Sequence, residues 1–415
     1  MRGNRSWSAV GLVSILLFSG PGFGFKIQVE KIPGQAEEGF IEIHGVGSDN
    51  FSAEIWEAGR LHFLPDYRSP LIRPKWDGVF RNIYAPSVVP RNDDWRVFYG
   101  AWDGSDRPND RLYSIDTPDF LTFHHRRLVI ENGPFIHVCN SHAIPWEDGG
   151  VLLAGTAYPV ENGLNKPIVF TSPDGEAWNG EPAGVYTASP KDLIPIGGYP
   201  GFEQADNNGA NVFLEENGKF HFYFFNFKDA GKIHHAFGGD PRRLEYQGVA
   251  LEPSAIVNDV KRFEDEGQNH YLMGLHRNGD RLFYSLSDSP ASFSPQRELF
   301  THLDESDLYI VALGWVTEGN RLLGVLYGAG ASPALNRNRI FARWLQKKIV
   351  LVDEDGREHF ASWALGPDRQ MVKVPAESKF QGTVKVYGDD GVTLLGETLL
   401  PKVGSGEILR VKLEE

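Results

Sequence analysis

Hydrophobic and polar residues alternate in short blocks through the centre of the chain, and no long stretch repeats at helical spacing. In five places two β-rich runs flank a polar turn, which is typical of a β-hairpin. The five blocks cover residues 85–100, 141–155, 210–224, 259–274 and 311–328. Their turns follow one another at intervals of roughly fifty residues, with a wider interval between the second and the third. The pattern therefore predicts a repeated β unit with a long insertion around residues 184–209.

Each block continues into a third β-rich run, and four of the five then reach another turn and an aromatic residue. A unit of four strands repeated every ~40–50 residues is the sequence pattern of a β-propeller blade. We therefore expect an all-β fold, a five-bladed β-propeller over residues 80–349. Its innermost strands should begin near Ala85, His142, Ala210, Asp259 and Val311. A large all-β sandwich is the alternative.

The two flanks of the repeat have a different pattern. Residues 350–415 contain short alternating strands separated by turns such as Asp389-Asp390-Gly391, which predicts a small C-terminal β-sandwich-like domain. This domain could serve for packing or as a carbohydrate-binding accessory. Residues 25–79 form a predicted N-terminal β segment, which either lies against that sandwich or closes the propeller through residues 54–64.

The first residues predict export. Arg2 and Arg5 precede an apolar run from Ala9 to Phe18, and Gly22 and Gly24 then place small residues two apart. This order is typical of a secretory signal peptide, here residues 1–24, and the apolar run is too short to span a bilayer as a helix. We expect a secreted or periplasmic protein whose mature form has no membrane anchor. An uncleaved N-terminal anchor is the alternative.

Composition excludes several classes of function. The net charge of −14 argues against a nucleic-acid partner, which requires a basic surface. Cys139 is the one cysteine, so neither an intramolecular disulfide nor a cysteine zinc site can form. No motif predicts a metal site or a cofactor, although a propeller channel could hold a structural cation.

Two segments of the first block carry a recognisable pattern. The first is Tyr84-Ala-Pro-Ser-Val-Val89, followed by an acidic turn and Trp95-Arg-Val-Phe-Tyr99, and the second is Tyr113-Ser-Ile-Asp-Thr-Pro-Asp-Phe120. They resemble the first-blade pattern and the blade edge of the clan of five-bladed propeller glycoside hydrolases that contains families 43 and 32. The resemblance covers about 270 residues and implies the propeller fold and action on a carbohydrate.

The sequence departs from the clan at its catalytic columns. Inverting members carry a base Asp in blade one, an orienting Asp in blade three and an acid Glu in blade four. The corresponding positions here hold Ala85, Gly209 and a residue near Ile256. Any hydrolysis must therefore use carboxylates from neighbouring positions.

Four carboxylates are the candidate catalytic residues. Glycoside hydrolysis by inversion needs two carboxyl groups roughly 6.5–9.5 Å apart, one of them protonated. Asp206 and Asp259 are the first choice, because both precede predicted inner strands. Asp103 could replace the missing base, and Glu203 in the insertion is a reserve acid. Each of the four could instead have a structural role in a turn or a loop.

Further polar and aromatic residues are expected to face the same end of the channel and bind sugar. Aromatic rings stack on sugar rings, and amides and charged groups bond to hydroxyls or to an acidic substituent. The predicted substrate-binding residues are Trp102, Asn140, His142, Asn208, His276, Arg277 and Arg337.

Three functions fit these patterns. The first is an exported glycoside hydrolase that degrades a plant or algal poly- or oligosaccharide. The second is a non-catalytic propeller that binds glycans, supported by the missing column carboxylates. The third is a glycoside phosphorylase, which would need a basic phosphate subsite.

Overall fold

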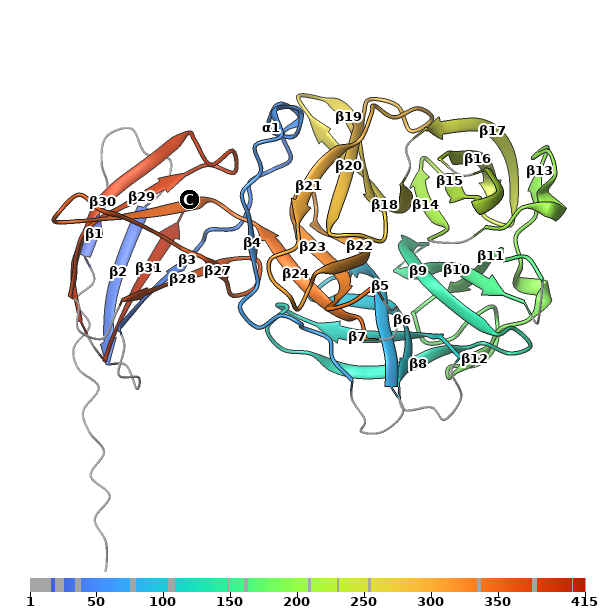
Figure 1. Ribbon diagram of the computed structural model, residues 1–415, viewed down its shortest axis with the longest axis horizontal. Coiled ribbons are helices and arrows are strands. Elements are labelled where there is room, and N and C mark those ends of the chain that lie inside the picture. The colour runs from blue at the N-terminus through green and yellow to red at the C-terminus, as the bar shows by residue number, and fades with distance from the viewer. Residues whose placement is uncertain are drawn as a thin grey trace, which may run out of the picture. The chain divides into compact units, whose positions relative to one another are not determined.

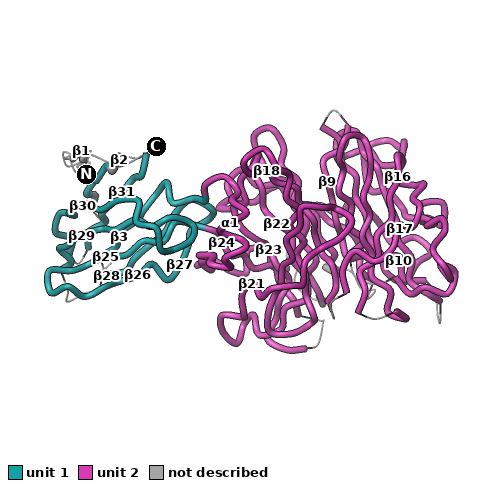
Figure 2. Tube along the Cα trace, turned by 90° about the horizontal axis from the view of Figure 1, so that it is seen from above, with its two compact units in different colours: residues 1–48, 346–415 teal, residues 49–345 magenta. Residues whose placement is uncertain are grey.

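The computed structural model describes residues 16–18, 26–33, 39–74, 80–103, 109–147, 149–159, 163–207, 210–229, 231–252, 255–333, 337–374, 379–404 and 406–414. The chain divides into two units (Figure 2). Unit 1 comprises residues 1–48 and 346–415, and unit 2 comprises residues 49–345. In the described part of the chain, no helix is long and apolar enough to cross a membrane.

Unit 2 contains five sheets among its described residues, arranged around a common centre like the blades of a propeller (Figure 1). The all-β propeller prediction is confirmed. Each blade is a meander of antiparallel neighbours, which buries aromatic and branched residues between sheets. The main strands are, in blade order, β5 (Phe80–Pro90), β6 (Trp95–Asp103), β7 (Arg111–Thr117) and β8 (His124–Glu131); β9 (His137–Trp146), β10 (Gly150–Tyr158) and β11 (Lys166–Ser172); β14 (Val212–Glu216), β15 (Lys219–Phe225), β16 (Ile233–Asp240) and β17 (Arg243–Leu251); β18 (Ile256–Asp265), β19 (Gln268–His276), β20 (Arg281–Ser287) and β21 (Arg297–Thr301); β22 (Tyr309–Glu318), β23 (Arg321–Gly330) and β24 (Arg339–Leu345).

The first strands of the five blades pack against one another in a closed ring, in the order β5, β9, β14, β18, β22 and back to β5. The fifth blade takes its outer strand, β4 (Phe63–Pro65), from the N-terminal side of the chain. The short helix α1 (Ala53–Ala58) precedes β4 and packs Trp56 against Trp315, with ring centroids 5.9 Å apart. Residues that precede the first blade in the sequence therefore complete the fifth blade and close the propeller. This is the second of the two arrangements expected for residues 25–79.

The second blade differs from the predicted four strands. Its described sheet contains only β9, β10 and β11, and Leu193 adds a single antiparallel bridge to Ile168. The predicted insertion instead supplies short strands to the neighbouring blades. β12 (Tyr186–Thr187) pairs parallel with β8, and β13 (Ile196–Gly197) pairs parallel with β17. The insertion thus links three blades along their outer edges, and it also contains the short helical turns η1 (Pro190–Asp192) and η2 (Phe202–Gln204). A third such turn, η3 (Phe227–Asp229), lies between β15 and β16 of the third blade.

Unit 1 is a β-sandwich of two sheets. One sheet has the order β1-β2-β31-β3-β28-β27 and the other β26-β25-β29-β30. Its strands are β1 (Leu16–Phe18), β2 (Lys26–Pro33), β3 (Gly39–His44), β25 (Lys348–Asp353), β26 (Glu358–Phe360), β27 (Trp363–Ala364), β28 (Arg369–Val374), β29 (Phe380–Tyr387), β30 (Leu394–Val403) and β31 (Glu407–Glu414). The sandwich therefore combines both ends of the chain, because β2 and β3 from the predicted N-terminal segment share a sheet with β31.

Most of the predicted signal peptide lies outside the described residues. Within it only β1 is described, as an edge strand paired with β2. Cleavage near Gly24 would remove β1 and leave the other five strands of that sheet.

Candidate functional site at the channel mouth

The starts of the inner strands surround a pocket of about 290 Å³ at one end of the channel, which we call the channel-mouth pocket. All five blades contribute to it. Its lining among the described residues is Asn82, Tyr84, Ala85, Trp102, Asp110, His137, Asn140, Tyr158, Ala210, Phe227, Ile256, Asn258, His276, Asn278, Val311 and Ala312. The predicted site residues Trp102, Asn140 and His276 are brought together here.

A repeated break in strand pairing turns these residues toward the channel. The register between first and second strands shifts around Ala85, Asn140, Asn258 and Val311, which is the pattern of a β-bulge. Ala85 and Asn140 have positive φ values of 48° and 56°, a conformation that costs free energy for residues other than glycine. Strained backbone at a pocket of this kind is typical of functional sites. Ala85 adopts this strained backbone conformation although its side chain carries no carboxyl group.

Asp110 is the one carboxylate among the described lining residues. The Tyr84 hydroxyl donates to its Oδ2 at 3.0 Å, and its backbone N–H donates to Nδ1 of His137 at 2.9 Å. Its Oδ1 is buried and accepts no hydrogen bond from the described residues. Burial raises the pKa of Asp110, against the opposing effects of His137 and Tyr84. A carboxyl group with a raised pKa keeps its proton to a higher pH, and one with a free oxygen can then act as a proton donor.

His276 is the second titratable group that the geometry favours. It is buried, and its Nδ1–H donates to Oδ1 of Asn258 at 2.7 Å. Burial lowers the pKa of His276 to about 4. The ring is therefore neutral above that pH, and the bond to Asn258 places the lone pair on Nε2; a hydrogen bond with Asn278 partly opposes the effect of burial on the pKa.

Amides and aromatic rings complete the pocket. Asn82, Asn140, Asn258 and Asn278 offer both donors and acceptors, and Oδ1 of Asn82 is buried with no partner among the described residues. The rings of Trp102, Tyr84, Tyr158 and Phe227 supply flat apolar surface. Buried polar atoms without a partner usually await a ligand or water, and flat rings next to amides suit a sugar.

His142 and Asp259 lie away from the pocket, in a row of buried polar contacts between blades. Ser87, His142 and Asp259 each accept a backbone N–H from the inner strand of the following blade, at Ala143, Phe213 and Trp315 respectively. We call these three residues the inter-blade row. They join neighbouring sheets where an unpaired N–H would be costly.

Both carboxylate oxygens of Asp259 have partners among the buried residues around it. It accepts Nε2–H of His142 at 3.0 Å and lies 3.1 Å from Nζ of Lys261, with no exposed surface. Burial by itself would raise the pKa of Asp259, but Lys261 and His142 outweigh it and hold the pKa below its usual value. The structure therefore contradicts the prediction that Asp259 and His142 face a ligand: both are inaccessible and fully bonded.

Asp206 and Glu203 also lie outside the described lining of the pocket. Oδ1 of Asp206 accepts the backbone N–H of Asn165, and its own N–H donates to Asn226. Glu203 lies on η2, with an exposed side chain, and its backbone oxygen accepts Lys166. Asp206 organises a loop junction, which is the structural role that its turn-rich setting allowed.

The remaining predicted residues are scattered. Arg277 is exposed and stacks over Phe283 at 4.7 Å, and Arg337 is exposed and absent from the described lining. The side chain of Asp103, at the end of β6, and all of Asn208 lie outside the described residues. The sequence patterns did not single out Asp110 as a candidate catalytic residue; its one signal was its place at the end of the loop before the third strand of blade one.

No described group of residues offers a convincing metal site. Asp116, His124 and His125 come within 4.8 Å of one another. However, Asp116 already binds Arg96 at 2.7 Å and Arg91 at 3.3 Å, so its negative charge is compensated. The channel-mouth pocket, with one carboxylate among its described residues, likewise lacks the oxygen-rich set that a divalent cation prefers.

Comparison with known proteins gives the fold. No protein-family model and no curated protein sequence matches the chain. Among solved structures, a candidate glycosidase from Bacteroides thetaiotaomicron superposes with a TM-score of 0.50 and 13% identity, over 71% of this chain and 99% of that one. The catalytic domain of a GH62 α-L-arabinofuranosidase from Coprinopsis cinerea has a TM-score of 0.49 and 15% identity, over 69% and 98%. A candidate glycoside hydrolase from Parabacteroides distasonis has a TM-score of 0.49 and 13% identity, over 70% and 98%. At this level of identity the first similarity establishes a shared fold over 71% of this chain.

Proposed function

We propose that this protein is an exported glycoside hydrolase that cleaves a poly- or oligosaccharide in the channel-mouth pocket. The observation that carries the proposal is that two titratable side chains line one pocket, partly buried Asp110 with its partnerless Oδ1 and buried His276, and that their pKa values are displaced in opposite directions. The pKa of Asp110 is raised and that of His276 is lowered to about 4. Such divergence is how a site obtains an acid and a base at the same pH.

Asp110 is the general acid in this proposal. Its protonated carboxyl group gives its proton to the glycosidic oxygen as the bond to the anomeric carbon breaks. Tyr84 holds the Oδ2 atom, so the partnerless Oδ1 is the atom that is available to the substrate.

His276 is the general base. The neutral ring takes a proton at Nε2 from a water molecule, whose oxygen attacks the anomeric carbon, so that both products leave as hydroxyl compounds. With a pKa of about 4, His276 has the basicity of an ordinary carboxylate. It can therefore replace the base carboxylate that the clan carries at the position of Ala85.

The rest of the pocket suits a neutral sugar. A sugar hydroxyl could donate to the partnerless Oδ1 atom of Asn82, while the sugar ring stacks on an aromatic side chain such as Trp102. No Lys or Arg occurs among the described lining residues, which speaks against a phosphate subsite and hence against a phosphorylase.

A non-catalytic glycan-binding propeller is the second candidate. Two observations favour it: Ala85 stands at the base column of the clan, and Asp110 is the only carboxylate in the described lining. This protein would bind a sugar in the same pocket without cleaving it.

Turnover across a panel of aryl glycosides and polysaccharides separates the two candidates. For an active substrate, kcat should fall as the pH drops through about 4, where His276 gains a proton. It should also fall as the pH rises through the raised pKa of Asp110, where the acid is lost. In His276→Gln the limb near pH 4 should disappear. Binding on a glycan array without turnover on any substrate would reject hydrolysis in favour of the binding function.

Export is tested separately. N-terminal sequencing of the protein recovered outside the cytoplasm should give a mature chain that begins near Phe25. A retained N-terminus that fractionates with membranes would contradict cleavage.

A further inference from the structure

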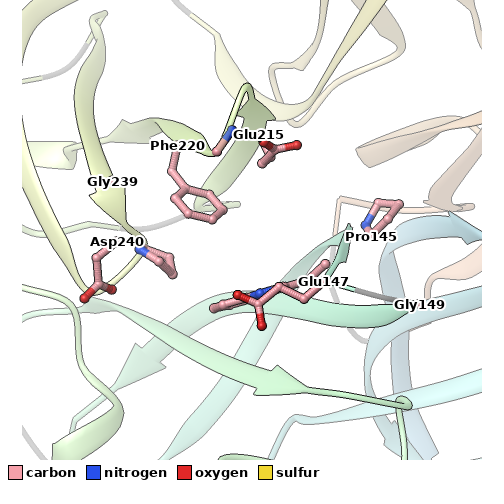
Figure 3. Close-up of a pocket in the computed structure, with 10 residues that line it drawn as sticks. Pro145, Glu147, Gly149, Glu215, Phe220, Gly239 and Asp240 are labelled. Atoms are coloured by element: carbon pink, nitrogen blue, oxygen red, sulfur yellow. Dashed lines mark hydrogen bonds between the residues drawn. The ribbon is translucent and has the colours of Figure 1, made fainter.

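A second and larger cavity, of about 800 Å³, lies between the second and third blades (Figure 3). Three turns surround it: the β9–β10 turn, the β14–β15 turn and the turn from β16 into β17. We call it the turn cavity. Its volume lies within the range of small-molecule pockets, which is about 300–1,000 Å³.

The turn cavity and the channel-mouth pocket lie at opposite ends of the same strands. Asn140, near the start of β9, lines the channel-mouth pocket, whereas Trp146, at the end of β9, lines the turn cavity. Six residues of extended strand separate the two positions by about 20 Å. A small sugar in one site therefore cannot reach the other, and the turn cavity has no part in the proposed chemistry.

The floor of the turn cavity is aromatic. Trp146 and Phe220 lie with ring centroids 5.9 Å apart and planes inclined by 50°, and Figure 3 shows the Phe220 ring directed into the space between the turns. The indole N–H of Trp146 donates to none of the described residues, so this ring offers both a flat face and a donor. Pro145 and Pro241 add further apolar surface beside it.

The rim supplies hydrogen-bond acceptors from each of the three turns, at Glu147, Glu215 and Asp240 (Figure 3). The carboxylate of Glu147 has no bonding partner among the described residues. Oε1 of Glu215 accepts the N–H of Gly218 at 2.6 Å, which leaves its Oε2 for a ligand. Oδ1 of Asp240 accepts the N–H of Arg242 at 2.8 Å, and its Oδ2 lies 3.9 Å from Nε of Arg243.

The arrangement of these acceptors decides the class of ligand. The three carboxylates do not converge within 4.8 Å as the ligands of a metal ion would. No Lys or Arg is among the described lining residues, which disfavours an anionic ligand. Dispersed acceptors around two aromatic rings fit a molecule with many hydroxyl donors and flat apolar faces, which describes a neutral saccharide.

We propose that the turn cavity is a second, non-catalytic binding site for a neutral saccharide chain, on the face of the propeller opposite the channel mouth. The site would hold the polymer while another segment of it is processed or bound elsewhere. This proposal does not depend on whether the channel-mouth pocket is catalytic.

Affinity electrophoresis of the full chain tests it, with xylan, arabinan, mannan and a mixed-linkage glucan as neutral probes and polygalacturonate as the acidic probe. We expect a neutral polysaccharide to retard the wild-type protein and polygalacturonate to leave it unretarded. Trp146→Ala should weaken the binding of that neutral polysaccharide at least ~10-fold, because a stacked ring is lost. Glu147→Gln, a milder change at an exposed position, should weaken it less.

Two controls make the result specific. Tyr67→Ala removes an aromatic ring that is 59% exposed in the same unit but outside the cavity, and should bind as the wild type does. Trp102→Ala alters the channel-mouth pocket, so a residual retardation in this variant belongs to the turn cavity. Equal thermal unfolding of Trp146→Ala and wild type confirms that the fold is intact.

The proposal is overturned if no neutral probe retards the wild type, or if Trp146→Ala and Glu147→Gln bind as the wild type does. It is also overturned if Trp102→Ala alone abolishes all binding. The failure of the hydrolase proposal would look different: aryl glycosides, which are too short to reach the turn cavity from the channel, would not be cleaved by any variant.

Discussion

Two aspartates, one partly buried at the channel mouth and one fully buried in the inter-blade row, show what separates a candidate chemical site from a structural one. Asp259 accepts bonds from His142 and the Trp315 backbone and lies beside Lys261. Asp110 has a single hydroxyl donor, Tyr84, on one oxygen and none from the described residues on the other. Their pKa values accordingly move apart, below the usual value for Asp259 and above it for Asp110.

The difference shows that burial alone does not identify a catalytic acid. A buried carboxylate whose oxygens are all bonded joins elements of the fold, and it has nothing left to offer a substrate. A carboxyl group with a buried oxygen that accepts no hydrogen bond lowers the stability of the fold, and such a group is retained where it serves a function. Substitutions in the inter-blade row and at the channel mouth test this difference separately.

The largest effect on stability is expected from Asp259→Ala. The change leaves Lys261, the His142 N–H and the Trp315 N–H without their acceptor, and breaking a buried pair in this way costs about 3–5 kcal/mol. Urea unfolding followed by tryptophan fluorescence measures the loss. Glu181→Ala, at an exposed position of the same unit, is the control and should stay within about 0.5 kcal/mol of the wild type. A urea midpoint equal to that of the wild type in Asp259→Ala would contradict the structural role that we assign to the inter-blade row.

A smaller loss is expected from Ser87→Ala in the same row. Its Oγ accepts the Ala143 N–H at 2.8 Å, and a buried donor left without a partner costs about 1–3 kcal/mol. The same unfolding measurement applies. A larger loss in the free energy of unfolding for Ser87→Ala than for Asp259→Ala would show that the compensated charge of Asp259 is not the main contribution of the inter-blade row to stability.

Asp110→Asn should affect stability in the opposite direction. A raised pKa means that the folded protein holds the proton more tightly than the unfolded chain, so this group lowers stability as the pH rises through its folded pKa. Removing the charge should therefore leave the free energy of unfolding at pH 7 equal to or above that of the wild type. A clear loss of stability at pH 7 would mean that the Asp110 carboxylate is a structural acceptor.

The smallest expected effect is on the slope of stability against pH. Burial lowers the pKa values of His235 and His276 to about 4, below the unfolded value near 6.5. Their unfolded forms bind the proton more readily, so stability should decline as the pH falls from about 6.5 towards 4. Unfolding curves of wild type and His276→Gln across this range should show a shallower decline in the variant. Parallel declines would show that His276 titrates near its ordinary pKa.

The fold could be predicted because it repeats. Alternating blocks with turns at near-constant spacing specify strands without any knowledge of their partners, and five such blocks predict a propeller. What could not be predicted were the long-range pairings. β12 and β13 join blades other than the one they follow, and β3 pairs with β31 from the far end of the chain. Short strands of this kind are specified by their neighbours in space rather than by their own pattern.

The site was predicted less well than the fold, for a physical reason. The starts of the inner strands do gather at one pocket, and Trp102, Asn140 and His276 lie there as expected. However, one residue of strand decides whether a side chain faces the channel or the next blade. Asn258 lines the pocket while Asp259, its neighbour, lies in the inter-blade row. The bulge that sets this register leaves no signal in the sequence.

The turnover of Asp110→Asn on a substrate of the wild-type enzyme tests the central claim most directly. Asparagine keeps the size of the side chain and its contact with Tyr84 but has no proton to give to the leaving group. The account predicts that kcat falls by about 10²–10⁴-fold while the variant unfolds no earlier than the wild type. Near-normal turnover by a stable Asp110→Asn protein would contradict the assignment of Asp110 as the acid and of the channel mouth as the active site.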